Sequence, residues 1–145
     1  MKLVISLFVL GLMTVMHPLW ADGGSDGPDP VPDKIIRLID SEQYDRAAAE
    51  LKTFVNIEKK NADAWNWLGY SQRSLGDLDA SLKSYKKALR IDRKHLGANE
   101  YLGELYVMRG EMDKAQKQLS KLAKYCGDCD QFEKLQEVIS NAGSG

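Results

Sequence analysis

The sequence predicts an all-α protein built from repeated pairs of helices. Three observations carry this prediction: apolar residues recur at spacings of three and four, glycines fall between the apolar runs, and the sequence matches itself when it is shifted by 34 residues. No segment after Lys34 alternates apolar and polar residues as a half-buried strand does. The chain of 145 residues is therefore expected to form one helical domain.

Composition and charge exclude several classes of function. The chain has 20 Lys and Arg against 21 Asp and Glu, so its net charge of −1 offers no basic field to nucleic acid or to an anionic membrane surface. Two His and two Cys are too few for a metal site built from several such ligands. We therefore expect no nucleic-acid partner, no resident metal and no cofactor.

Residues 1–21 have the pattern of a signal peptide. Lys2 gives a positive start, an uncharged apolar run extends from Leu3 to Met16, and Ala21 is a small residue before a cleavage point. The apolar run of about 14 residues is shorter than the roughly 20 that span a bilayer. We therefore expect an exported protein of the bacterial periplasm, with no stable membrane insertion after cleavage. A secreted protein and one anchored by an uncleaved N-terminal segment are the alternatives.

Residues 22–32 follow with the sequence DGGSDGPDPVP. This composition, rich in Gly, Ser and Pro, leaves little to bury, so we expect a flexible, solvated tether. The remaining body, residues 33–142, is large enough for a modest core that unfolds as one unit.

Three copies of a 34-residue unit lie in register along this body. Leu68-Gly69 returns as Leu102-Gly103, and Gly76 returns as Gly110. Gly76, Gly110 and Gly127 each follow an apolar run and are expected to end a helix by adopting a left-handed conformation. Asp77 is expected to cap the helix that follows Gly76. Four columns align across all three copies: Tyr44, Leu78 and Met112; Ala47, Ser81 and Ala115; Leu51, Tyr85 and Leu119; and Phe54, Ala88 and Leu122.

Small residues in these columns predict close helix crossings. Gly69 and Gly103 are expected to let the second helix of their own pair approach closely, and the small partners on that helix are Ala47, Ser81 and Ala115. The larger columns are expected to face the next pair, because a single helical hairpin cannot cover its own apolar face.

These residues resemble the tetratricopeptide repeat. The middle copy carries Trp65, Leu68, Gly69, Gly76, Tyr85 and Ala88 at positions typical of that family. It departs from the family pattern at Gln72, Ser81 and Arg93 without breaking the period. The resemblance implies a right-handed α-solenoid of about three helix-turn-helix repeats with a C-terminal capping helix. The expected units are residues 33–61 (a degenerate first repeat), 62–95, 96–129 and the cap at 130–142.

The resemblance also implies a function. First helices of this family line a concave groove that holds a peptide or another protein, so we expect a non-enzymatic binding module, an exported adaptor or assembly factor. Aromatic and Arg side chains are frequent anchors of such interfaces. By register, the residues expected to line the groove are Asn66, Trp67, Tyr70, Arg73, Glu100, Tyr101, Glu104 and Met108.

Other functions are less well supported by the sequence. Some family members clamp a terminal carboxylate with Lys, Arg and Asn, but the matching positions of this chain hold Ile36, Trp67, Gly97 and Tyr101. The sequence contains no catalytic constellation and no Gly-rich phosphate loop, so we expect no enzyme. Two alternatives to a binding groove remain: Trp67 and Tyr101 only pack on adjacent helices, or the chain is a homo-oligomeric scaffold.

Cys126 and Cys129 lie at the turn expected before the closing helix. In an oxidising compartment the simplest interpretation is a local structural disulfide, worth about 2 kcal/mol because its loop is short. A redox-active dithiol and a metal or haem site are the alternatives. Against haem, Asp130 rather than His follows the second Cys, and His95 is the one histidine after residue 21. A thiol–disulfide or metal-handling protein using this pair is therefore the alternative function.

Overall fold

A computed structural model describes residues 27–143, and in that range the chain forms seven α-helices and no strand. The expected signal peptide and residues 22–26 of the expected tether lie outside the described residues. None of the described helices is long and apolar enough to cross a membrane. In chain order the helices are α1 (Asp33–Asp40), α2 (Tyr44–Ile57), α3 (Ala62–Ser74), α4 (Leu78–Ile91), α5 (Leu96–Met108), α6 (Met112–Cys126) and α7 (Asp130–Ala142).

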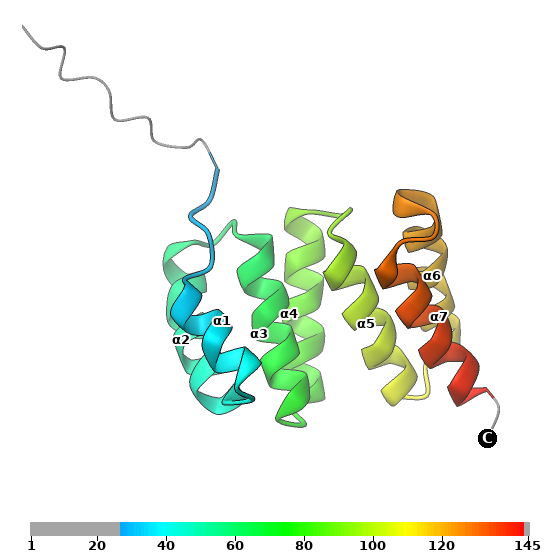
Figure 1. The fold of residues 1–145 in the computed structure, drawn as a ribbon, viewed down its shortest axis with the longest axis horizontal. Coiled ribbons are helices and arrows are strands. Elements are labelled where there is room, and N and C mark those ends of the chain that lie inside the picture. Colours follow the sequence, from blue (N-terminus) through cyan, green and yellow to red (C-terminus); the bar gives the residue numbers. More distant parts are fainter. Residues whose placement is uncertain (1–26, 144–145) are drawn as a thin grey trace, which may run out of the picture.

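The helices stack in two layers (Figure 1). Helices α1, α3, α5 and α7 form the nearer layer, which we call the first-helix face, and α2, α4 and α6 form the layer behind it. Each first helix packs on the second helix that follows it, and successive pairs are joined by contacts of α2 with α3 and of α4 with α5. The predicted α-solenoid of three helical pairs with a closing helix is confirmed.

The helix boundaries repeat the 34-residue period of the sequence. The second helices begin at Tyr44, Leu78 and Met112, and the first helices after α1 begin at Ala62, Leu96 and Asp130. Helix α7 thus occupies the place of a first helix in a fourth pair, where it packs on both α5 and α6. This position explains how α7 covers the apolar end of the array.

Short polar side chains begin several of these helices. The carboxylate of Asp77 accepts a hydrogen bond from the backbone N–H of Ala80, which confirms the predicted cap of α4. Asn61 caps α3 in the same way, and Nδ1 of His95 caps α5. Each cap satisfies one of the backbone N–H groups that a helix start leaves without an intrahelical partner.

Three glycines end helices as predicted. Gly76, Gly110 and Gly127 follow α3, α5 and α6 with φ values of 81°, 71° and 70°. Residues with a side chain rarely adopt this conformation, so glycine at these points stops the helix at little steric cost.

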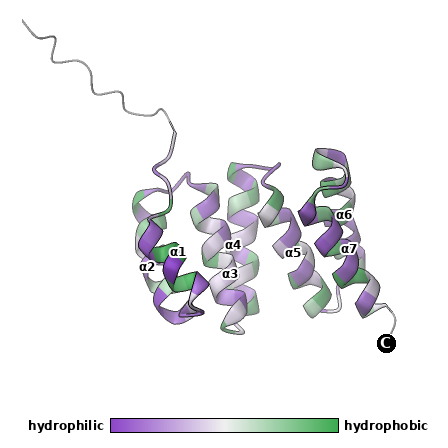
Figure 2. Ribbon diagram, viewed as in Figure 1, coloured by the Kyte–Doolittle hydropathy of each residue, from purple (hydrophilic) through white to green (hydrophobic). Residues whose placement is uncertain are grey.

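The buried core divides into two clusters along the solenoid. One joins α1 and α2 to α3, and the other joins α4 to α5, α6 and α7. Ala47, Ser81 and Ala115, the predicted small residues of the second helices, are fully buried. Hydrophobic and hydrophilic residues alternate along the helices, so each helix turns its apolar side to a neighbour and its polar side to solvent (Figure 2).

One predicted helix crossing differs in the structure. A Cβ on Gly69 would lie 2.7 Å from the ring of Tyr85 on α4, so Gly69 does allow its own second helix to approach. A Cβ on Gly103 would instead lie 2.7 Å from Cδ1 of Leu135 on α7. The prediction that Gly103 faces its own second helix is therefore wrong. Its physical reason is that Leu119, the counterpart of Tyr85, is smaller and only partly buried, and α7 supplies Leu135 instead.

The end of the expected tether is in contact with the first pair of helices. The carbonyl oxygen of Asp29 accepts a hydrogen bond from Nδ2 of Asn61. Val31 packs against the first core cluster, and Pro32 directly precedes α1. Residues 29–32 therefore belong to the folded unit.

Candidate functional site

Five of the eight residues expected to line the groove form one cluster between α3 and α5. Trp67, Tyr70 and Arg73 follow one another at spacings of three on α3, and Tyr101 and Glu104 do so on α5. Side chains three apart share a face of a helix. We call these five residues the Arg73 cluster.

Arg73 is the centre of this cluster. Its guanidinium forms an ion pair with the carboxylate of Glu104, and the two side chains are only 13% and 18% exposed. The same guanidinium lies over the rings of Tyr70 and Tyr101, with its carbon 5.4 Å and 5.3 Å from their centroids. The ion pair and the cation–π contact with Tyr101 connect the first helices of two successive repeats, whereas the contact with Tyr70 lies within α3.

The aromatic rings of the cluster contact one another. Tyr70 lies 5.1 Å from Tyr101 and 5.8 Å from Trp67, measured between ring centroids, and Trp67 lies 6.5 Å from Tyr101. Tyr44 on α2 extends the group, since its ring is 5.9 Å from that of Tyr70. Burial raises the pKa of Tyr101 to about 12, and the nearby carboxylate of Glu100 acts in the same direction. Burial also raises the pKa of Tyr70, so the phenol groups of Tyr70 and Tyr101 stay neutral at physiological pH.

The other three expected residues lie outside this cluster. Asn66 and Glu100 are each only 4% exposed, whereas Met108, at the end of α5, is largely exposed. Asn66 is buried against the start of α5, where its Nδ2 lies 3.4 Å from the point that a Cβ on Gly97 would occupy. The structure thus separates the eight residues into an interacting cluster, two buried polar groups and one exposed apolar side chain.

Glu100 has the most perturbed carboxylate of the described residues. Burial raises its pKa from 4.5 to about 7, and the negative charge of Glu104 adds to the rise. Lys134 and Arg73 act in the opposite direction, and Asp130 raises the pKa slightly further. Lys134 was absent from the predicted site, although it follows Glu100 by one 34-residue period and so occupies the same position on α7.

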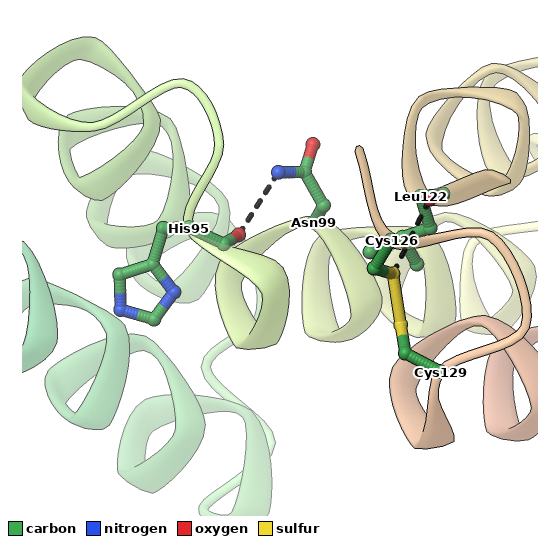
Figure 3. Close-up of a disulfide and its surroundings, with 5 residues drawn as sticks. All are labelled: His95, Asn99, Leu122, Cys126 and Cys129. Atoms are coloured by element: carbon green, nitrogen blue, oxygen red, sulfur yellow. Dashed lines mark hydrogen bonds between the residues drawn. A yellow bond between two sulfur atoms is a disulfide. The ribbon is translucent and has the colours of Figure 1, made fainter. Parts of the chain in front are cut away.

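Cys126 and Cys129 are joined by a disulfide between the end of α6 and the start of α7 (Figure 3). His95 lies apart from the two cysteines, at the start of α5 (Figure 3). Its Nε2 hydrogen-bonds the carboxylate of Asp63 at 2.9 Å. Because Nδ1 of His95 accepts a hydrogen bond from the backbone N–H of Ala98, Nε2 carries the proton and donates to Asp63. Within residues 27–143 no group of three or more His, Cys, Asp or Glu is arranged to hold a metal ion.

Comparison with known families supports the fold and its repeat. The family model of the tetratricopeptide repeat matches residues 62–95, the middle copy. The chain is a tetratricopeptide-repeat protein. It is 30% identical over 99 residues to the general transcriptional corepressor trfA of Dictyostelium discoideum, and 26% identical over 74 residues to tetratricopeptide repeat protein 1 of Schizosaccharomyces pombe. These matches cover 67% and 51% of this chain but only 7% of each relative.

Solved structures with similar folds include two peptide complexes. The type III secretion chaperone SycD of Yersinia enterocolitica, in complex with a peptide of the translocator YopD, has a TM-score of 0.67 at 17% identity, covering 76% of this chain and 84% of that one. The first tetratricopeptide-repeat domain of Spaghetti (RPAP3), bound to the HSP90 peptide SRMEEVD, has a TM-score of 0.70 at 13% identity, covering 78% and 90%. The TM-scores show that the fold is shared, and at identities this low the likeness extends to the fold alone.

Proposed function

We propose that this protein is a non-enzymatic module that binds a peptide or protein segment along the first-helix face, and that it acts as an exported adaptor or assembly factor. The observation that carries the proposal is the Arg73 cluster. It brings aromatic and Arg side chains from two successive repeats together on one face, in a fold that this chain shares with the peptide-bound SycD and Spaghetti domains.

The cluster has the chemistry of an interface anchor. Trp67, Tyr70 and Tyr101 are partly exposed, so a bound segment can cover them without rearranging the core. Because the ion pair and the ring contacts hold these side chains in place, little side-chain entropy is lost on binding. A rigid, partly exposed aromatic surface is therefore available before the partner arrives.

A display library of random peptides tests this proposal. We expect the wild-type protein to enrich a set of related peptides, and Trp67→Ala and Tyr101→Ala to weaken each of them by tenfold or more, the loss usual for an interface anchor. The Cys126→Ala/Cys129→Ala protein is the matched control and should retain binding. Circular dichroism establishes that each variant remains folded.

Two results would contradict the proposal. The first is enrichment of no peptide by the wild-type protein. The second is enrichment of peptides whose affinity is unchanged in both Trp67→Ala and Tyr101→Ala, which would leave these residues with a packing role alone.

We also propose that the protein is exported to the bacterial periplasm and that Cys126 and Cys129 form a structural bridge there. The signal-peptide pattern of residues 1–21 supports export, and the Cα–Cα distance of 5.6 Å suits a disulfide between helix ends. Intact-mass and N-terminal sequence analysis of the protein from cell fractions test both points. A cytoplasmic protein that retains Met1, or one with two free thiols, would contradict them.

A further inference from the structure

Two buried polar groups occupy the same repeat position on neighbouring first helices. Asn66 on α3 and Glu100 on α5 are 34 residues apart, and each is 4% exposed. Oδ1 of Asn66 receives no hydrogen bond from the described residues. The carboxylate of Glu100 takes part in no hydrogen bond or ion pair with the other described residues, and its oxygens, unlike Oδ1 of Asn66, keep some contact with solvent. The first-helix face thus holds two acceptors that lack donors.

A buried acceptor without a donor is costly. The penalty is on the order of 1–3 kcal/mol for a neutral group and more for a charged one, so buried acceptors are usually satisfied by protein groups, by water or by a ligand. The positive charges closest to Glu100 do not fill this role: Arg73 is paired with Glu104, and Lys134 is exposed on α7.

The surrounding charge favours a cation over an anion. Glu104 and Asp130 add negative potential at Glu100, and the guanidinium of Arg73 is already neutralised by its carboxylate partner. A carboxylate or phosphate placed here would meet the negative charge of Glu100, which Lys134, exposed on α7, offsets only in part. An ammonium or guanidinium would supply the missing hydrogen bonds and charge, and its alkyl chain would lie along the neighbouring rings.

We infer that Glu100, with Asn66 at the same repeat position on α3, is the recognition site for a Lys or Arg side chain of the bound segment. This inference rests on the proposed function, because it names the chemistry of the segment that the first-helix face accepts. The preferred partner is a basic peptide rather than one that ends in an acidic motif such as EEVD, the peptide end in the Spaghetti complex.

The experiment uses matched peptides and matched protein variants. Each peptide enriched by the wild-type protein is made in labelled form, and a second form carries norleucine in place of each Lys or Arg in turn. Fluorescence polarisation then gives the affinity of both forms for the wild-type protein, for Glu100→Gln, and for Glu137→Gln, a control that changes an exposed carboxylate of α7.

We expect one basic position in each peptide to matter. Its replacement by norleucine should weaken binding to the wild-type protein and to Glu137→Gln by about tenfold or more, as loss of a charge-assisted hydrogen bond does. The same replacement should change binding to Glu100→Gln by less than about twofold, because this variant lacks the carboxylate with which the basic side chain of the peptide pairs.

The outcomes separate the two proposals. Enriched peptides without Lys or Arg, or a norleucine effect of equal size in Glu100→Gln, would overturn this inference while the binding function stands. Enrichment of no peptide would overturn both. The norleucine peptides change only the ligand, so the comparison with wild-type protein holds even if Glu100→Gln folds poorly.

Discussion

Arg73 on α3 and Glu104 on α5 form an ion pair in which the guanidinium lies over the adjacent rings of Tyr70 and Tyr101. Both charged side chains are more than four-fifths buried, so each has lost most of its hydration. A single residue at this point therefore connects two repeats by charge, by hydrogen bonding and by ring contacts. The cost of removing one partner is expected to exceed what the intact pair contributes.

A double-mutant cycle tests this relationship. Arg73→Met leaves the carboxylate of Glu104 partly buried without a partner. Glu104→Leu leaves the guanidinium of Arg73 in the same position. Each substitution should lower the free energy of unfolding by about 2–4 kcal/mol. The double variant should lose less than either single one, because no charge is left unpaired. Urea denaturation of the four proteins measures these differences.

The exposed pair of Lys34 and Glu50 provides a control. Lys34→Met should change the free energy of unfolding by less than about 1 kcal/mol, since an ion pair in water contributes little. An Arg73→Met effect as small as that of Lys34→Met would mean that the buried pair is well solvated in solution.

Substitution of the two crossing glycines should have unequal effects. Gly69→Ala places a Cβ against the rigid, fully buried ring of Tyr85, and overpacking of this kind costs about 1–3 kcal/mol. Gly103→Ala meets the methyl groups at the end of Leu135, which is also fully buried but has more rotamers than a tyrosine ring, so the overpacking should cost less. The gain in helix propensity of about 1 kcal/mol is common to both substitutions. Thermal unfolding should therefore rank Gly69→Ala well below Gly103→Ala.

A compensating substitution checks the cause. Gly69→Ala combined with Tyr85→Leu removes the ring that the new methyl group meets, so the second change should cost less in the Gly69→Ala protein than in the wild type. Equal costs in both backgrounds would show that the ring does not limit the approach of α3 to α4.

The disulfide should contribute modestly to stability. It closes a loop of only a few residues between α6 and α7, for which chain entropy gives about 2 kcal/mol. Cys126→Ser/Cys129→Ser should therefore lower the free energy of unfolding by about that amount. Dithiothreitol should have the same effect on the wild-type protein and none on the variant. If dithiothreitol leaves the free energy of unfolding of the wild-type protein unchanged, the result would contradict a disulfide that is formed and accessible.

The sequence predicts most of the fold because the fold is repetitive. Each helical pair places a small residue at the same crossing, so the period of the sequence becomes the period of the helices. A residue with positive φ follows the first helix of each pair: Gly76 and Gly110 in the second and third pairs, and Glu42, with φ 57°, in the first. The partner of Gly103 could not be predicted in this way. It depends on α7, which contains none of the family's typical residues, and on the difference between a ring at Tyr85 and a smaller side chain at Leu119.

The candidate site is predicted in part for a similar reason. Trp67, Tyr70 and Arg73 share one face of a helix, and spacing along the chain is enough to place them together. The pairing of Arg73 with Glu104 and the burial of Glu100 depend on how closely α3, α5 and α7 approach one another. That separation depends on residues such as Gly97, which leaves room for Asn66, and Leu135, which packs on Gly103, and the pattern of a single helix contains neither contact.

Glu100 should make the protein less stable as the pH rises. Burial and the charge of Glu104 raise its pKa from 4.5 to about 7 in the folded protein. Between these values the folded protein holds a proton that the unfolded chain has released, so the free energy of unfolding falls as the pH increases through this window. Below about pH 4.5 the carboxyl group is neutral in both states and imposes no penalty.

Glu100→Gln should remove this dependence, because the amide is neutral at every pH. At about pH 8 the variant should be more stable than the wild-type protein by about 1–3 kcal/mol, and at about pH 4 the two should be nearly equal. Urea denaturation at both pH values measures the difference, in which the titration of all other carboxylates cancels. Glu137→Gln should follow the wild type at both values. A Glu100→Gln protein that is less stable than the wild type at the higher pH would show that the carboxylate of Glu100 is stabilised as an anion, and that it already has a partner.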